Sequence, residues 1–251
     1  MKNLIAIAFL AILIVACASE EKKEKEVSVN LDQYPPKLVK VLEAHGGLET
    51  WNKQKLLKFS KGEEIHTIDL SNRKSLVVSP KYTLGYNGKN TWLKEKDSAA
   101  FKGNPDFYHN LFFYFYAMPF VLADDGIVYD ATDSLIVEGK SYPGIKISFK
   151  DGVGASSKDN YYLYYNPKNH QMEWLGYTVT FFDNKAKDET SIIKYDEWQD
   201  IDGLKLPRSL VWYEKDSIGN IVPPKTVNPV TFEEVSLSTK EVDSTFFEEV
   251  E

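Results

Sequence analysis

The chain has 251 residues, of which 43% are hydrophobic and 14% aromatic, so it can bury the core of one large domain or two small ones. Its formal net charge of −7 argues against a nucleic-acid partner, because binding to phosphates depends on clustered Lys and Arg. The single cysteine excludes an internal disulfide and a thiolate metal cluster.

The first residues have the pattern of a lipoprotein signal peptide. Residues 4–15 form an uninterrupted apolar run, too short for a membrane-spanning helix of about 20 residues but suited to a signal-peptide core. Residues 14–17, Ile-Val-Ala-Cys, resemble the lipobox of bacterial lipoproteins. This resemblance implies that residues 1–16 are removed and that Cys17 carries several acyl chains of the palmitate type, which anchor the protein in a membrane. A buried structural cysteine is the alternative.

Residues 17–33 are expected to form the acylated cysteine and a flexible tether. The run of Glu and Lys at 20–26 cannot bury enough apolar surface to fold. The acidic pair Glu20-Glu21 is similar to a surface-export signal of lipoproteins in some Gram-negative lineages, and a plain spacer is the alternative. We therefore expect a protein anchored by lipid in the outer membrane, facing either the periplasm or the exterior.

A helix is predicted where the folded part of the chain begins. Leu38, Val41, Leu42 and His45 repeat at i, i+3, i+4 and i+7, which places them on one helical face. Two glycines at 46–47 stop this helix, because the first can adopt the left-handed conformation of a C-terminal cap.

From residue 56 onward the hydrophobic period changes to two, which indicates strands. Asn87-Gly88 predicts a hairpin with a type I′ turn, since both central residues of that turn need positive φ. About ten short strands, separated by turn residues, predict a mainly β (α+β) fold. We expect a strongly curved antiparallel sheet or incomplete β-barrel, with an N-terminal helix and mid-chain lid helices, as one domain over residues 34–251.

The segment between residues 103 and 125 interrupts the strand pattern. Asn104-Pro105 is a good helix start, and aromatic residues follow at helical spacing until Met118-Pro119 breaks the helix. A second short helical segment begins at Phe120. Because the whole segment is apolar on nearly all sides, it is either a plug in the core or the roof of a cavity.

The order of these elements resembles the superfamily of lipoprotein carriers that contains LolA, LolB and LppX-like lipoproteins. The resemblance rests on short stretches at residues 44–48, 86–92, 161–168 and 203–207. It implies a bent sheet that forms an incomplete barrel, helices that plug its open side, and acyl chains bound between them. The carriers use an arginine to hold the lid helices, and this chain has two arginines, Arg73 and Arg208. An anchored member is more similar to the receptor or LppX-like branch.

Sequence motifs for catalysis and metal binding are missing. The chain has no Gly-x-Ser-x-Gly nucleophile elbow, no His-Glu-x-x-His zinc motif, no EF-hand and no complete phosphate-binding loop. His45-Gly46-Gly47 is loosely similar to an oxyanion-hole segment, but its place at a helix end favours a capping role. We therefore expect no enzymatic activity, no cofactor and no metal site.

Three functions are consistent with this sequence. The first is a membrane-anchored carrier, receptor or sensor that binds a lipid or an acyl-bearing ligand in an apolar cavity. The second is an anchored interaction module with a filled core, which presents its surface to another envelope protein. The third is an envelope hydrolase whose catalytic groups are brought together only by the fold. The cavity volume behind residues 111–118 distinguishes the first function from the second.

For the first function, helical spacing and strand alternation predict the residues that line the cavity. In the lid these are Phe112, Phe115 and Met118. In the sheet they are Tyr82, Leu84, Trp92, Ile147, Phe149, Leu163, Tyr177 and Val179. Each strand has two possible registers, and a slip of one residue moves its whole set to the outer face.

Overall fold

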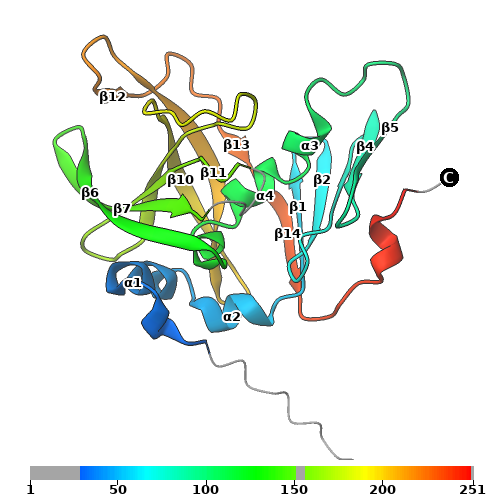
Figure 1. Cartoon of the computed structure of the whole chain (residues 1–251), viewed down its shortest axis with the longest axis horizontal. Helices are drawn as coiled ribbons and strands as arrows, with labels where there is room; N and C mark the ends of the chain where they lie inside the picture. The colour runs from blue at the N-terminus through cyan, green and yellow to red at the C-terminus, as the bar shows by residue number, and fades with distance from the viewer. Residues whose placement is uncertain (1–28, 151–155, 250–251) are drawn as a thin grey trace, which may run out of the picture.

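The computed structural model describes residues 29–150 and 156–249. The predicted signal peptide, Cys17 and the first part of the tether lie outside these described residues. Figure 1 shows two antiparallel sheets with a short helical segment between them. Within the described residues, none of the helices combines the length and the hydropathy that crossing a membrane would require.

The helices at the start of the folded part follow the predicted pattern. The 3-10 helix η1 (Leu31–Gln33) precedes α1 (Pro36–Ala44), whose buried face is formed by Leu38, Val41 and Leu42. The helix ends at two glycines with positive φ, and α2 (Leu48–Lys53) begins directly after them. A Cβ atom at Gly46 would lie 2.2 Å from the carbonyl oxygen of Gly203, so this close approach also requires glycine.

The smaller sheet has the strand order β14-β1-β2-β3-β4-β5. Its strands are β1 (Leu56–Lys61), β2 (Glu64–Asp69), β3 (Ser75–Val78), β4 (Tyr82–Tyr86), β5 (Thr91–Glu95) and β14 (Glu233–Ser238). The first five form a meander, and β14 joins β1 from the far end of the chain. The last helical turn, η3 (Ser244–Phe247), lies next to this sheet, where Trp92 Nε1 donates a 2.9 Å hydrogen bond to the Phe247 carbonyl.

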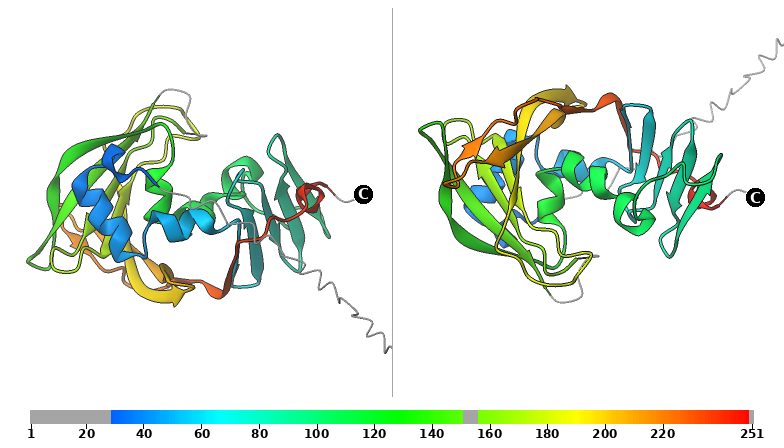
Figure 2. Two further views of the ribbon diagram at one scale, coloured as in Figure 1. Left: turned by 90° about the horizontal axis from the view of Figure 1, so that it is seen from below. Right: turned by 90° about the horizontal axis from the view of Figure 1, so that it is seen from above.

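The larger sheet has the strand order β12-β11-β10-β9-β8-β7-β6, and β13 also pairs with β11. Its strands are β6 (Ile127–Val137), β7 (Lys140–Phe149), β8 (Tyr161–Tyr165), β9 (Met172–Tyr177), β10 (Ser191–Ile201), β11 (Leu204–Lys215), β12 (Ile221–Val222) and β13 (Val230–Thr231). Register shifts interrupt the pairing of β6 with β7 and of β10 with β11, and the edge strands β6 and β12 contact each other. Figure 2 shows this sheet curving around the helical segments.

The predicted fold class, mainly β with a strongly curved antiparallel sheet and added helices, is confirmed. The described residues contain fourteen strands in two sheets, more than the roughly ten expected from pattern. Part of the difference arises because β12 and β13 have two residues each, which is too short to produce an alternation.

The hairpin between β4 and β5 is present, but its predicted type I′ turn is wrong. Gly88 has a positive φ of 91°, whereas Asn87 does not. The loop is instead closed by the Asn87 side chain, whose Oδ1 accepts hydrogen bonds from the backbone N–H groups of Lys89 and Asn90 at 3.0 and 2.9 Å. An asparagine side chain that imitates a backbone turn removes the need for positive φ at both positions.

Candidate functional site

The helical segment between the sheets consists of three short pieces. They are α3 (Pro105–Tyr108), α4 (Leu111–Tyr116) and the 3-10 helix η2 (Phe120–Ala123). Asn104 caps α3 as predicted, since its side chain accepts a 3.2 Å hydrogen bond from the Phe107 N–H. The cis peptide bond between Met118 and Pro119 separates α4 from η2. The segment crosses the molecule between the two sheets, so each of its sides has a different neighbour (Figure 2).

Tyrosine hydroxyls from the larger sheet and from the residues just before α1 form hydrogen bonds to the backbone of this segment. The hydroxyl of Tyr195 donates a 2.8 Å hydrogen bond to the Phe115 carbonyl, and that of Tyr129 donates a 2.7 Å bond to the Leu122 carbonyl. Tyr34 donates in the same way to the last residue of η2, at 3.0 Å. These bonds satisfy carbonyls at the ends of α4 and η2, which have no partner within so short a helix.

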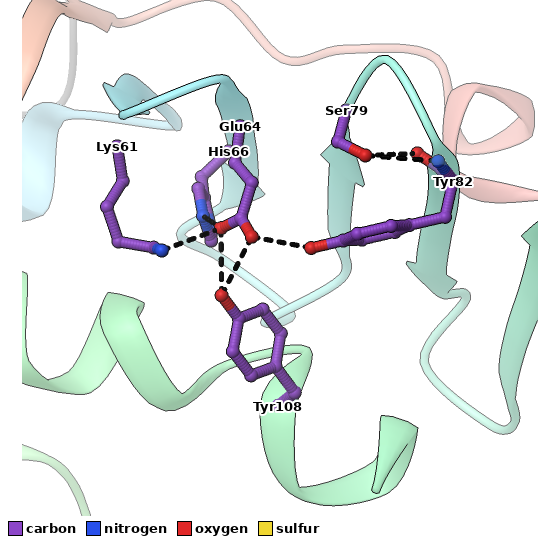
Figure 3. A network of polar contacts seen from close by, with 6 residues as sticks. All are labelled: Lys61, Glu64, His66, Ser79, Tyr82 and Tyr108. Atoms are coloured by element: carbon purple, nitrogen blue, oxygen red, sulfur yellow. Dashed lines mark hydrogen bonds and ion pairs between the residues drawn. The ribbon is translucent and has the colours of Figure 1, made fainter. Parts of the chain in front are cut away.

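Glu64 anchors α3 to the smaller sheet (Figure 3). Its carboxylate accepts hydrogen bonds from the hydroxyl of Tyr108 at 2.9 Å and from the hydroxyl of Tyr82. Nε2 of His66 and the ammonium of Lys61 each lie 3.0 Å from one of its oxygens. Four neighbours therefore occupy the carboxylate, which leaves no free lone pair aimed at a substrate.

Hydrogen bonds keep the carboxylate of Glu64 in this network ionised. Burial alone would raise the pKa of Glu64, but the hydrogen bonds from His66, Tyr82 and Lys61 outweigh it and lower the pKa to about 2. Burial lowers the pKa of His66, although the bond to Glu64 opposes this effect. Glu64 is thus an ionised structural anchor beside a histidine that burial keeps neutral.

Arg73 holds the end of the same segment. Its Nη2 donates to both carboxylate oxygens of Asp124, at 2.7 and 2.8 Å, and its guanidinium lies 5.0 Å from the Phe113 ring. Arg208 lies on β11 instead, where it is exposed and 4.0 Å from Glu197. Of the two arginines that the family resemblance made candidates for holding the lid, only Arg73 contacts the helical segment.

An apolar cavity of about 260 Å³ lies between this segment and the larger-sheet side. Its apolar lining includes side chains from α4, η2, the link between them and the ends of β6 and β7, namely Phe115, Met118, Val121, Leu122, Ile127 and Phe149. The cavity therefore lies directly behind residues 111–118. A hollow at this place was expected for a ligand-binding protein and a filled core for an interaction module.

The polar groups of the cavity are mostly acidic. Asp106 and Asp125 are exposed at its edge, whereas Asp159 is buried and accepts a 2.6 Å hydrogen bond from the Thr180 N–H. Burial raises the pKa of Asp159 although its hydrogen bonds oppose the shift. Arg73 and Asp124 complete the charged lining as an ion pair.

A second cavity of about 330 Å³ lies on the other side of the Arg73–Asp124 pair. It is lined mainly by polar groups around α2, including Asn52, Gln54 and Lys55. Across the described parts of the chain, no group of three or more His, Cys, Asp and Glu side chains is arranged to hold a metal ion. The apolar cavity is therefore the candidate functional site.

Three of the eleven predicted lining residues, Phe115, Met118 and Phe149, line the cavity. Phe112 faces the smaller sheet, with Lys61 Nζ 4.2 Å from its ring centroid. The other seven are distributed over both sheets: Tyr82, Leu84 and Trp92 on the smaller sheet, Ile147 and Leu163 in the buried core of the larger sheet, Tyr177 against Phe115, and Val179 after β9.

Sequence reasoning identified only half of one face of the helical segment and missed the lining residues in two distant loops. Phe107, Leu111, Phe115 and Met118 follow i, i+4, i+8 and i+11 spacing, and all four line the cavity. That spacing could have selected Leu111 over Phe112. Phe181 also lines the cavity from a loop, where no periodic pattern exists to identify it.

Comparisons with known proteins assign no activity to this chain. A family model described as a family of unknown function, DUF6503, matches residues 47–220. A search of curated proteins found no match. Among solved structures, the chain is similar to a DUF1329 family protein from Desulfovibrio piger, with a TM-score of 0.44, 9% identity, and coverage of 84% of this chain and 95% of that one.

It is also similar to a LolA superfamily protein from Nitrosomonas europaea, with a TM-score of 0.43, 8% identity, and coverage of 88% of this chain and 99% of that one.

Proposed function

The chain belongs to the DUF6503 family of unknown function, and we propose that it is a lipid-anchored envelope protein that binds a lipid or an acyl-bearing ligand in the cavity beside α4. The observation that carries this proposal is the apolar cavity of about 260 Å³ behind the helical segment. A filled core would have favoured the interaction module instead.

The size and lining of the cavity suit one alkyl chain. A dry apolar cavity of about 150 Å³ can bind benzene, and sites for drug-sized ligands begin near roughly 300 Å³. The present volume lies between the two. Each methylene that leaves water for such a lining contributes about 0.8 kcal/mol, so a chain of moderate length gains affinity without a charged anchor.

The N-terminal sequence supports a membrane location. The apolar run at 4–15 and Cys17 have the pattern of a lipoprotein signal, and the charged stretch at 20–26 separates the anchor from the folded domain. An anchored domain of this kind would work within reach of a bilayer, where acyl chains are abundant. We propose the outer membrane as this location, with the domain on its periplasmic or its external side.

Filling the cavity tests the proposal. Ile127 lines the cavity, whereas its neighbour Val128 is 38% exposed on the other face of β6. Ile127→Trp should reduce the affinity of the full chain for 1-decanol at least tenfold, because the indole occupies the space of the alkyl chain. Val128→Trp, the matched control, should bind as the parent does. Titration calorimetry of amphipol-stabilised protein measures both affinities.

Native mass spectrometry provides an independent readout. Protein extracted gently from membranes should carry an added mass that corresponds to one amphiphile, and Ile127→Trp should lose it. An unliganded spectrum together with no binding of 1-decanol to the parent chain would reject the proposal and favour the interaction module.

A further inference from the structure

We infer that the ligand of this cavity carries a positively charged ammonium head group in addition to its apolar chain. This inference rests on the proposed function and specifies the ligand class for the same site. Two independent features of the lining support it: an excess of carboxylates over cationic side chains, and aromatic rings among the same lining residues.

The first feature is the charge balance of the lining. Four aspartates, Asp106, Asp124, Asp125 and Asp159, face a single cation, Arg73. Both carboxylate oxygens of Asp124 accept from Arg73 Nη2, so this pair is neutral as a unit. No ion pair within 4.0 Å joins the other three aspartates to any Lys or Arg in residues 29–150 and 156–249. The lining therefore carries an excess of negative charge.

The second feature is a group of aromatic side chains in the same lining. Phe107 follows Asp106 on α3, and its ring lies 5.1 Å from that of Phe181. Tyr161 follows Asp159 by two residues, and all three rings line the cavity. The negative face of an aromatic ring attracts ammonium groups, and rings combined with carboxylates are a recurring arrangement for their recognition.

These features discriminate between head groups of different charge. A carboxylate or phosphate head would meet the net negative charge of the lining, and among the described residues the one donor that the Arg73–Asp124 pair leaves without a partner is the buried Nη1 of Arg73. A neutral alcohol would gain the burial of its chain alone. An ammonium head would gain the same burial and also attraction from the carboxylates and ring faces, because opposite charges interact strongly where little water intervenes.

Three probes with the same decyl chain test the inference on the full chain in amphipol. Decyltrimethylammonium should bind at least tenfold more tightly than 1-decanol, and decanoate should bind more weakly than 1-decanol. The advantage of the ammonium probe should shrink as salt is added, because part of the attraction is screened. Titration calorimetry measures all three affinities below the concentrations at which the probes form micelles.

A charge variant identifies the groups responsible. The double substitution Asp106→Asn and Asp125→Asn removes two exposed carboxylates from the cavity edge, and it should reduce the preference for the ammonium probe about tenfold while 1-decanol binds as before. The matched control is Asp130→Asn with Asp133→Asn, which removes the same charge from exposed positions of β6 away from the cavity. This control should retain the preference.

The possible outcomes separate the two proposals. Equal binding of the three probes, or tighter binding of decanoate, would overturn the ammonium head group and leave the apolar cavity function intact. A preference for ammonium that survives the Asp106/Asp125 substitutions undiminished would also overturn it. Binding of none of the probes would reject the cavity function itself, and the head group with it.

Discussion

His45 shows how one buried side chain can connect three distant segments. Its Nδ1 lies 3.0 Å from the Lys205 carbonyl, which can only accept, so Nδ1 carries the proton. Its Nε2 then accepts the backbone N–H of Met172 at 3.0 Å. The ring thereby ties the end of α1 to the starts of β9 and β11. The expected role of His45 at the helix end is thus structural, and an oxyanion-hole role has no support in this geometry.

Cys17 lies outside the described residues, and its acylation is a prediction from the sequence. Cys17→Ala should move the protein from the membrane fraction to the soluble fraction and abolish labelling with an alkynyl palmitate analogue, because the thiol is the acceptor of the acyl chain. Cell fractionation and in-gel detection measure the two effects.

Ser19→Ala changes a neighbouring residue and keeps the thiol, so it serves as the control for Cys17→Ala and should behave as the parent chain. Palmitate labelling that persists in Cys17→Ala would disprove the assignment of Cys17 as the acylated residue.

At the level of elements, α3 is too short to be stable alone. A single turn of four residues gains little from its own hydrogen bonds, so side-chain contacts must hold it in place. Tyr108 bonds to Glu64, and His109 lies 3.1 Å from the Ser75 hydroxyl while its ring stacks on Tyr86. Both anchors belong to the smaller sheet. The opposite side of α3 is thereby left to face the cavity through Phe107.

The Tyr108–Glu64 contact should contribute measurably to stability. Tyr108→Phe keeps the ring and removes the hydroxyl that donates to an ionised carboxylate, so the free energy of unfolding should fall by about 1–3 kcal/mol. Tyr162→Phe is the control, because that hydroxyl has no hydrogen-bond partner within the described residues, and it should change stability by less than about 0.5 kcal/mol. Urea unfolding of both variants provides the measurement, and equal stabilities would show that Tyr108 does not anchor α3.

The elements that sequence patterns predicted are those stabilised by local periodicity. The face of α1 was identified because Leu38, Val41 and Leu42 are spaced for one helix and are all buried. Pro207 lies inside β11, close to the register shift at Glu197 of the paired strand β10, and alternation alone does not predict a strand that contains a proline. A bulge tolerates a residue that cannot donate to a ladder, but it leaves no signal in the sequence.

The cavity was only partly predictable for a related reason. Its helical wall follows from spacing within one segment, and Phe115 and Met118 were identified on that basis. Asp159 and Phe181 join the lining from loops more than thirty residues away in the chain, and their place depends on how the larger sheet curves. Strand registers decide such contacts, and a single sequence does not determine a register.

For the whole molecule, stability should depend on pH because burial keeps histidines neutral. Burial lowers the pKa of His45 and of His109 to about 4 from the ordinary value of 6.5. Between these values the unfolded chain binds protons that the folded chain does not, so stability falls as the pH decreases from 6.5 to 4. Glu64 contributes at lower pH. Because its pKa in the folded chain is about 2, its contribution to stability is lost as the pH falls below the ordinary pKa of 4.5.

Unfolding in urea between pH 7 and pH 4.5 tests this expectation. Each of the two histidines should reduce the free energy of unfolding by roughly 2–3 kcal/mol over this range, because one pKa unit corresponds to about 1.4 kcal/mol. His109→Phe retains the stacking on Tyr86 and removes the titrating ring. The decrease in the free energy of unfolding between pH 7 and pH 4.5 should therefore become smaller by the contribution of one histidine.

His170→Asn is the matched control for His109→Phe, because His170 is partly exposed and asparagine tolerates its φ of 59°. This variant should keep the dependence of the parent chain. A parent chain whose stability is constant over the whole pH range would show that burial does not hold these histidines neutral. It would also remove the physical basis for treating the packing of α1 and α3 as the acid-sensitive part of the fold.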